Sequence, residues 1–429
     1  MSQKELRRAG VLSRVKAAAL KLVEAAELMG LSYRQGKRLW KRYGKQGPEG
    51  LQHGNAGRRS NRAKAKEFRK RVLGLVRKHY GGGPGERFGP TLAAEQLEKD
   101  HGVRMDAETL RRWMLAEGLW SRQRKGKAYR KRRARKEHFG ELVQMDGSFE
   151  AWLEARGPRG CLMDMVDDAT GITLAQLGAE ETTWAAADCL RAWVEKYGIP
   201  QALYTDWKNV YLREPTPKEQ LRGEAPLTQF GRMCAKLGIR MIGASSPQAK
   251  GRCERKHGVH QDRLIKLLRL RGIASFEQTN QYLEREYLPE HNQRFGKTPA
   301  KAANYHRPVE GGLDLRRVFC LEEERTVSQD WVLRYHNQFL QLEPKGKRYL
   351  PAGSKVVVEQ WRDGSLHVVY RQGEVGWKAI EALPQRPATA SQLLQPPRAA
   401  AHKPGTEHPW RQMRVFTTTS KAQFLFAKR

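Results

Sequence analysis

The chain has 429 residues, and its 80 Lys and Arg against 46 Asp and Glu give a formal net charge of +34. This length predicts about two to four domains, and a charge of this size is tolerated best when a polyanion such as nucleic acid is the working partner. With no run of about 18 apolar residues and no cleavable leader, we expect a soluble protein of the cytoplasm that does not bind membranes.

The first predicted element is a helix-turn-helix within residues 13–43. Apolar residues recur there at helical spacing, and the sequence MGLS at 29–32 interrupts them. Ser32 would be the N-cap of the second helix. That helix would present to a major groove the following side chains, which suit phosphates and purine edges: Arg34, Gln35, Lys37, Arg38, Lys41 and Arg42. The alternative is a basic helical hairpin that only packs.

A linker rich in Gly, Asn and Arg is predicted at residues 50–62, followed by a second helical unit at 63–120. One helix would begin near Thr91 and another at Asp106, each with an acceptable N-cap and an acidic residue in its first turn. This pattern predicts a second helix-turn-helix or a winged variant, with Arg111 and Arg112 as candidate DNA contacts.

The segment 121–136 contains ten Lys or Arg and no acid. Such a block cannot form a core, and we expect it to follow phosphates between two modules. Its candidate contacts are Arg130, Arg132 and Arg133. A nuclear-import signal and a merely solvated face are the alternatives.

After Phe139 short apolar runs alternate with helical stretches, which is typical of a mixed α/β layer. Strands are predicted at 142–145, 161–167, 173–177, 202–205 and 240–244, and helices at 183–197, 228–237 and about 247–270. This is the element order of an RNase H-like fold.

From about 324 to 382 strands return without helices, at 331–334, 338–342, 355–361 and 366–370. The sequence RDGS at 362–365 predicts a hairpin, because Asp-Gly suits a tight turn. A small β-barrel is expected here. The residues after 384 predict a tail with little core of its own.

Two aspartates follow apolar strands of the α/β region. Asp146 ends the run LVQMD at 142–146, and Asp206 ends ALYTD at 202–206. Ligand chemistry collects at strand ends in such sheets. If the strands are neighbours, the two carboxylates repel one another and need a cation between them. Asp164, Asp167 and Asp168 compete for the first position, but VDDATG at 166–171 is typical of a hairpin turn.

A third acid, Glu254, would lie two turns inside a helix whose start is marked by Ser246 and Pro247. Hard oxygen ligands predict Mg²⁺ or Mn²⁺, and two such ions about 4 Å apart would support in-line displacement at phosphorus. On the same segment, Lys250, Arg252 and Arg255 could hold DNA. His260 and Asp262 are interpreted as surface or strand contacts.

Five scattered cysteines form no CxxC pair and no Cys/His cluster, so neither a disulfide framework nor a zinc finger is indicated. We expect them to be reduced and buried.

Several runs together resemble one known group of proteins. They are ELVQMDGS at 141–148, VDDATG at 166–171, LYTD at 203–206 and SPQAKGRCER at 246–255, with EAAELMGLS at 24–32, GPTLAAE at 89–95, ETLRRW at 108–113 and QDRL at 261–264. The chain resembles the ISNCY group of bacterial insertion-sequence transposases, which have an integrase-type DDE catalytic core. The likeness extends over most of the chain.

The resemblance implies Asp146, Asp206 and Glu254 as the catalytic, metal-binding triad. It also implies cleavage at the ends of a mobile element, joining of the freed 3′ ends to target DNA, and a homo-oligomer that holds two ends together. A nucleoid-associated protein of the bacterial cytoplasm is expected. The alternatives are a DNA-binding regulator with an inactive core, an RNA or hybrid nuclease, and a structural nucleoid protein.

The predicted domains are therefore a helix-turn-helix domain at 1–60, a second DNA-binding unit with basic linker at 61–137, an RNase H-like core at 138–310, a small β-barrel at 320–385 and a flexible tail at 386–429.

Overall fold

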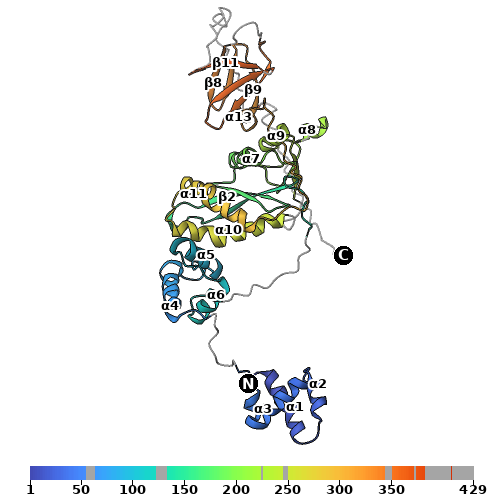
Figure 1. Ribbon diagram of the computed structural model, residues 1–429. Helices are drawn as coiled ribbons and strands as arrows, with labels where there is room; N and C mark the ends of the chain where they lie inside the picture. The colour runs from blue at the N-terminus through green and yellow to red at the C-terminus, as the bar shows by residue number, and fades with distance from the viewer. Residues whose placement is uncertain are drawn as a thin grey trace, which may run out of the picture. The chain divides into compact units, whose positions relative to one another are not determined.

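The computed structural model describes residues 1–54, 63–121, 133–223, 226–244, 250–343, 350–371 and 373–381, together with Glu407. The chain separates into two compact units, residues 1–129 and 130–429 (Figure 1). Within the described ranges, no helix is both long and apolar enough to cross a bilayer.

The amino-terminal elements are α1 (Gln3–Lys16), α2 (Leu22–Leu28), α3 (Tyr33–Gln46) and a 3-10 helix η1 (Gly47–Leu51). Their small core contains Leu12, Tyr43 and Leu51. The predicted linker therefore starts too early at residue 50, because Leu51 packs into this core. Residues 55–62 lie outside the described part of the chain.

The predicted helix-turn-helix is confirmed between α2 and α3. Gly30 has a φ of +63° in the turn, a conformation that glycine adopts without strain. Ser32 caps α3 by accepting from the Gln35 backbone N–H, while the Gln35 side chain accepts from the Ser32 N–H, each at 3.3 Å. The reciprocal pair satisfies two amides that have no partner within the helix.

The next helices are α4 (Lys66–Leu75), the π-helical turn η2 (Val76–Tyr80), α5 (Pro90–His101) and α6 (Ala107–Ala116). Asp106 caps α6 as predicted, accepting from the Thr109 N–H at 2.9 Å. For α5 the prediction of an acidic residue in the first turn was wrong. The helix starts at Pro90 after Gly89, without a side-chain cap or an acid in that turn, because Pro fixes a helical φ at the first position.

The second unit contains a five-stranded sheet in the order β3-β2-β1-β4-β5. Its strands are β1 (Val143–Glu150), β2 (Gly160–Asp167), β3 (Thr173–Gly178), β4 (Ala202–Thr205) and β5 (Arg240–Gly243). The first three pair antiparallel, and β1, β4 and β5 pair parallel. The mixed α/β layer predicted from the sequence is confirmed, with every predicted strand present.

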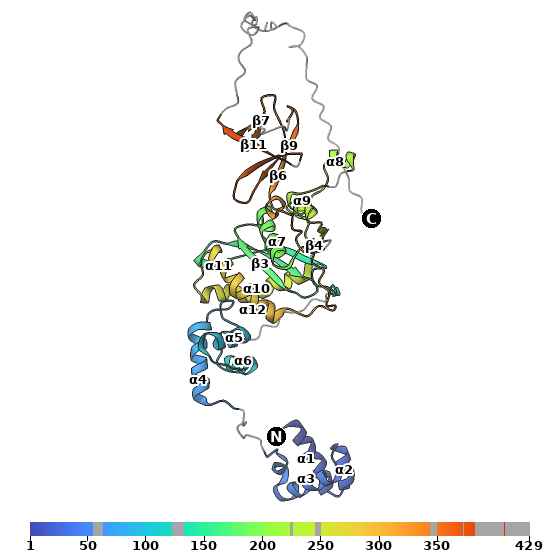
Figure 2. The same cartoon turned by 45° about the horizontal axis from the view of Figure 1, so that its top comes forward.

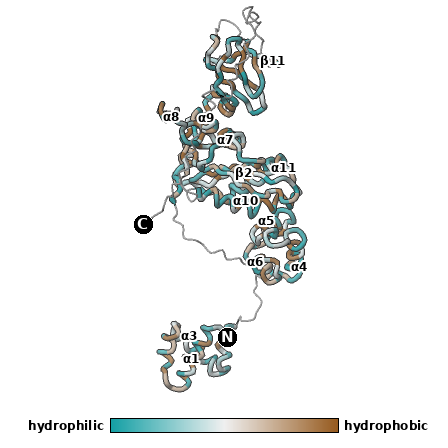
Figure 3. Tube along the Cα trace, turned by 180° about the vertical axis from the view of Figure 1, so that it is seen from behind, coloured by the Kyte–Doolittle hydropathy of each residue, from teal (hydrophilic) through white to brown (hydrophobic). Residues whose placement is uncertain are grey.

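Helices cover both faces of this sheet. Figure 1 and Figure 2 show α7 (Thr183–Tyr197) and α9 (Gln229–Lys236) on one face, and α10 (Gly251–Leu270), α11 (Phe276–Tyr282) and α12 (Leu288–Phe295) on the other. Figure 3 shows hydrophilic, teal colouring along α10. The helices α8 (Pro217–Arg222), α11, α12 and α13 (Leu315–Val318) and the π-helical turn η5 (Leu283–Tyr287) were not predicted.

The last strands form a nearly closed sheet of six, in the order β6-β9-β10-β11-β8-β7, where a small barrel was expected. They are β6 (Leu321–Thr326), β7 (Val332–Tyr335), β8 (Gln338–Glu343), β9 (Lys355–Gln360), β10 (Leu366–Tyr370) and β11 (Gly373–Ile380). The β9–β10 hairpin is confirmed. Two strands, β6 and β11, were missed, and the predicted tail lies outside the described residues apart from Glu407.

Two glycines of α3 give opposite expectations. A Cβ on Gly36 would lie 2.9 Å from the Ala26 Cβ, whereas a Cβ on Gly44 would meet nothing within 4 Å. Gly36→Ala should therefore destabilise the helix-turn-helix by about 1 to 3 kcal/mol, and Gly44→Ala should stabilise it by about 0.5 to 1 kcal/mol. Peptide-resolved hydrogen exchange of residues 22–46 in the full-length protein measures both. Shifts in the same direction would contradict the close approach of α2 and α3.

Candidate active site

Asp146 and Asp206 lie at the same level of two parallel strands. The pairing between β1 and β4 joins Val143 with Leu203 and Gln144 with Tyr204, so both aspartates come two residues after the last pair. Asp206 follows β4 as predicted. Asp146 does not end its strand, because β1 continues to Glu150 in its pairing with β2. It lies instead where β1 parts from β4.

One ammonium group bridges the two aspartates. Lys250 Nζ lies 2.8 Å from Asp146 Oδ1 and 3.6 Å from Asp206 Oδ2, and its side chain is only 7% exposed. A second ammonium, that of Lys208, lies 3.3 Å from Asp206 Oδ2. The other Asp206 oxygen, Oδ1, is buried and accepts no hydrogen bond from the described residues. The pair of acids therefore binds positive charge here and keeps one oxygen free of hydrogen bonds.

Glu254 lies on the first turn of α10, exposed and four residues after Lys250. The predicted position two turns inside the helix was wrong, because α10 starts at Gly251 and residues 245–249 lie outside the described part of the chain. Its carboxylate does not form a three-ligand cluster with those of Asp146 and Asp206 within 4.8 Å in the described residues. The turn of α10 that carries Glu254 lies against β1, because the Cys253 backbone N–H donates to Gln144 Oε1 at 3.4 Å.

A buried glutamate, Glu181, supports the Asp206 side of the site. It accepts hydrogen bonds from Lys208 Nζ at 2.5 Å and from the Tyr211 hydroxyl at 2.8 Å. Burial opposes the charge on Lys208, but Glu181 and Asp206 together raise the pKa of this ammonium. Gly147 makes room for Glu181, since a Cβ there would lie 2.8 Å from Glu181 Oε2.

A second buried carboxylate, Asp168, fixes the start of α10. It accepts from Arg252 Nε at 2.6 Å, from Gln144 Nε2 at 2.8 Å and from the Lys136 backbone N–H at 2.8 Å, and it also pairs with Arg133. Burial alone would raise the pKa of Asp168, but these hydrogen bonds and the charges of the two arginines hold that pKa below its ordinary value.

The other aspartates considered for the first acid position lie in different surroundings from Asp146. Asp167 closes the β2–β3 turn, accepting from the Thr170 N–H at 2.7 Å and from the Gly140 N–H at 3.0 Å, which confirms the predicted hairpin. Asp164 lies opposite Asp146 in the β1–β2 register and is fully buried. His260 does not lie on the surface, which was one of the two positions predicted for it, because its side chain is fully buried beside Asp164 of β2.

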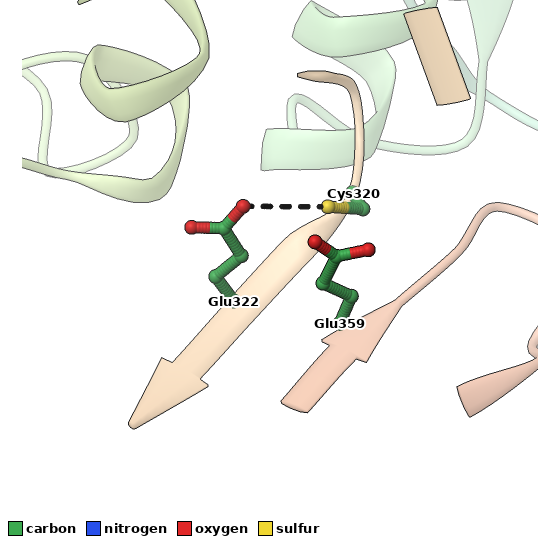
Figure 4. Close-up of side chains that lie close together, drawn as sticks. All are labelled: Cys320, Glu322 and Glu359. Carbon is green, nitrogen blue, oxygen red and sulfur yellow. Dashed lines mark hydrogen bonds between the residues drawn. The ribbon is translucent and has the colours of Figure 1, made fainter. Parts of the chain in front are cut away.

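The described residues contain one group of three potential metal ligands with converging atoms, and it lies elsewhere, at Cys320, Glu322 and Glu359 (Figure 4). Glu322 already pairs with Arg232 Nη1 at 2.9 Å and with Lys236, and Glu359 accepts from Trp361 Nε1 at 3.2 Å. Burial raises the pKa of the Cys320 thiol to about 11. These neighbours satisfy the carboxylates without an ion, so the cluster joins α9 to strands β6 and β9.

The Asp146 and Asp206 pair fits a hard divalent cation better. Both offer carboxylate oxygens, Asp206 Oδ1 has no hydrogen-bond partner among the described residues, and a positive group already lies between the two acids. Mg²⁺ and Mn²⁺ prefer such oxygen ligands. The five cysteines are buried free thiols, as predicted.

The predicted DNA-contacting face of α3 is exposed. All six side chains named for it are solvent-accessible, from Arg34 to Arg42. Two of them also have internal roles, because Gln35 caps the helix and Arg42 Nη2 donates to the Gln52 carbonyl at 2.8 Å. The helix offers a continuous basic surface of the kind that enters a major groove.

The other predicted DNA contacts fall into three groups. Arg112 and Arg255 are exposed. Arg111 pairs with Glu108, Arg133 and Arg252 pair with Asp168, and Lys250 pairs with Asp146, so in this conformation their charges have internal partners. Arg130 and Arg132 lie outside the described residues. None of these contacts is tested by the geometry, and they remain predictions.

Comparison with known proteins identifies the family. The chain is 36% identical over 384 residues to y4bF of Sinorhizobium fredii, which is named as a transposase, covering 89% of this chain and 82% of that protein. The chain belongs to the insertion-sequence transposase family. Another member, the transposase for insertion sequence IS1202 of Streptococcus pneumoniae, is 27% identical over 380 residues, covering 79% of this chain and 78% of its own.

A family model described as a helix-turn-helix domain matches residues 7–61 of the present chain. Among solved structures, the HTLV-2 integrase catalytic core domain in complex with magnesium is 16% identical with a TM-score of 0.27, over 34% of this chain and 83% of its own. A chain of a simian T-cell lymphotropic virus intasome is 14% identical with a TM-score of 0.31. The match covers 70% of this chain and 95% of that one.

Sequence reasoning missed Glu181 altogether, and it named Asp164 and Asp168 only as competitors for the first acid position. Each of the three acts through partners that are distant in the chain. Gly147, directly after Asp146, was one available signal, because a glycine inside a strand often marks the close approach of another group.

Asp168→Asn should destabilise the second unit by about 3 kcal/mol at pH 7, because Arg252 and Arg133 would lose their carboxylate partner. The folded-state pKa of Asp168 is lowered, so its contribution is present above the unfolded pKa of about 3.9 and is lost as the pH falls through the folded-state value. Urea unfolding of both proteins at several pH values tests this.

The control for this measurement is Glu195→Gln, which removes one partner of an exposed pair with Arg191 and should change stability by less than about 1 kcal/mol. The role assigned to Asp168 predicts that Asp168→Asn lowers the free energy of unfolding more than Glu195→Gln does. It would be contradicted if the two losses were equal, or if the loss in Asp168→Asn grew toward low pH.

Proposed function

We propose that this chain is a DDE transposase that binds the ends of its insertion sequence, cleaves DNA there and joins the 3′ ends to target DNA. Asp146, Asp206 and Glu254 would be its catalytic triad and would hold two Mg²⁺ or Mn²⁺ ions. The observation that carries the proposal is the Asp146–Asp206 pair, which lies on adjacent parallel strands and is bridged by Lys250.

Family membership supports the general activity, and the strand order supports the core. Three antiparallel strands followed by two parallel ones, with helices on both faces, are consistent with the predicted RNase H-like core. In this arrangement Asp146 and Asp206 repel each other strongly unless a cation lies between them. Glu254, on the first turn of α10, would complete the ligand set from above the strand ends.

Two such ions, when bound, would activate the attacking water or 3′-hydroxyl and stabilise the leaving oxygen. The residues of the chain would orient the reaction without supplying a general base. Lys250 would leave the two aspartates as the ions bind, and its ammonium would then be available to a phosphate of the DNA. Lys208 would remain with Glu181, which holds it at 2.5 Å.

DNA recognition would come mainly from the amino-terminal unit. The exposed basic face of α3 would read an end sequence in the major groove, and the basic segment before the core would follow the backbone. Because two element ends must be joined in one event, we propose a homo-oligomer, at least a dimer, as the working form. The domain boundaries given above belong to this proposal.

The direct test uses DNA from either side of the gene. Purified protein with Mg²⁺ or Mn²⁺ should nick and join the candidate inverted ends. Asp146→Asn, Asp206→Asn and Glu254→Gln should each lower cleavage by at least about 10³-fold, because each removes a charge that stabilises the transition state, while binding to the ends persists. Asp262→Asn, an exposed acid of the same helix, should retain full activity.

Three results would redirect the proposal. Binding to the ends without cutting in either metal would favour a DNA-binding regulator with an inactive core. Cleavage by Asp146→Asn at the wild-type rate would remove this residue from the triad. Cutting of RNA or hybrid strands in preference to duplex DNA would favour a nuclease.

Lys250→Met should strengthen metal binding, whereas each triad variant would lose a proposed metal ligand. Without Lys250, Asp146 and Asp206 have no shared counter-charge, so the metal-free protein should be less stable. Mn²⁺ no longer competes with the ammonium and should bind at least about fivefold more tightly, which corresponds to ~1 kcal/mol.

Isothermal titration with Mn²⁺ and thermal unfolding with and without Mn²⁺ measure both effects. The matched control is Lys208→Met, which removes the ammonium that contacts Asp206 but not Asp146. Mn²⁺ affinity of Lys250→Met equal to or weaker than that of wild type would contradict the bridging role.

A further inference from the structure

A buried polar layer lies between α10 and the sheet, directly behind Asp146. Asp146 and Asp164 are cross-strand partners on β1 and β2, and α10 packs over both strands. From α10, His257 and His260 face these acids. The layer is unusual for a protein core, where a fully buried carboxylate needs partners to offset its lost hydration.

Asp164 is the carboxylate of this layer that most needs such partners. It is fully buried, and neither of its oxygens accepts a hydrogen bond from the described residues. The groups that face it are His260 Nε2 at 3.4 Å and His257 Nε2 at 3.6 Å from Oδ2. Both nitrogens are buried and have no hydrogen bond of their own among the described residues. The two imidazoles therefore face this carboxylate directly.

The two histidines differ in what their second nitrogen meets. His260 Nδ1 is hydrogen-bonded with the Tyr287 hydroxyl at 2.8 Å, which anchors it within the helical layer. His257 Nδ1 points instead to Asp146, with 4.0 Å between it and Oδ2. His257 is therefore the link between the buried Asp164 and the acid proposed as a metal ligand.

His257 also lies one turn after Glu254 on α10. A contact from His257 to the sheet thus constrains the helix that carries the third acid as well as the orientation of the first. Groups behind metal ligands commonly set ligand orientation in this way, and their loss typically weakens metal binding by about 10 to 100-fold.

We propose that His257, held by Asp164, is a positioning residue that orients Asp146 and sets the position of Glu254 over it for metal binding. The inference rests on the proposed function. It assigns His257 no contact with substrate and no part in proton transfer, and it assigns His260 a structural role only.

The geometry supplies variants that separate the two nitrogens. A Gln amide nitrogen takes the place of Nε2, and an Asn amide nitrogen takes the place of Nδ1. His257→Gln would keep the atom that faces Asp164 and lose the one that faces Asp146, so Mn²⁺ affinity should fall about tenfold. His257→Asn should lose about threefold or less. His260→Gln, the matched control, should keep wild-type Mn²⁺ affinity, although it loses the Tyr287 partner.

Mn²⁺ binding by the full-length protein without DNA, followed by electron paramagnetic resonance, is the readout, with the thermal unfolding midpoint recorded for each variant. Asp164→Asn provides a second approach and should also weaken Mn²⁺ binding, even if His257→Gln fails to fold. Weaker Mn²⁺ binding in the Gln variant at position 257 and unchanged binding in the one at position 260 would support the proposal.

Equal Mn²⁺ affinities in both Gln variants, whether both unchanged or both reduced in proportion to lost stability, would overturn it. So would wild-type affinity in Asp164→Asn. A wild-type protein that binds no Mn²⁺ would instead refute the proposed metal site itself, so failure of the positioning role and failure of the proposed function are distinguishable.

Discussion

The repulsion between Asp146 and Asp206 is the constraint on which the rest of the candidate site depends. The parallel register of β1 and β4 places both carboxylates at one level, where the strands part. Such a pair is stable only with positive charge between its members. Here Lys250 supplies that charge, and the same requirement makes the site suited to divalent cations.

Three other buried carboxylates surround this pair, and each has its own set of partners. Glu181 holds Lys208 and Tyr211 on the β4 side, and Asp168 holds Arg252 where α10 begins. Asp164 faces two histidines beneath α10. Because one partner of each comes from a distant segment, these acids tie the sheet, the loop after β4 and α10 into one arrangement around Asp146 and Asp206.

The sequence predicts the elements far better than these contacts. Strand β4 and helix α7 agree with prediction to the residue, because a short apolar run and a capping Thr182 are local signals. The acid-rich strand β6 has no such pattern, so it was missed. Asp206 could be found from its strand-end position, and Asp146 from the apolar run before it, although its strand continues. The bridging Lys250 and the buried His260 depend on tertiary packing that no local pattern encodes.

The central claim is that the Asp146–Asp206 pair binds a divalent cation in place of the Lys250 ammonium. A crystal structure of the full chain with Mn²⁺, with anomalous scattering to locate the ion, tests this most directly. We predict a Mn²⁺ peak coordinated by both aspartates, with Lys250 Nζ moved away from them. A Mn²⁺ ion at Cys320, Glu322 and Glu359 with Lys250 still bridging the aspartates would contradict the account.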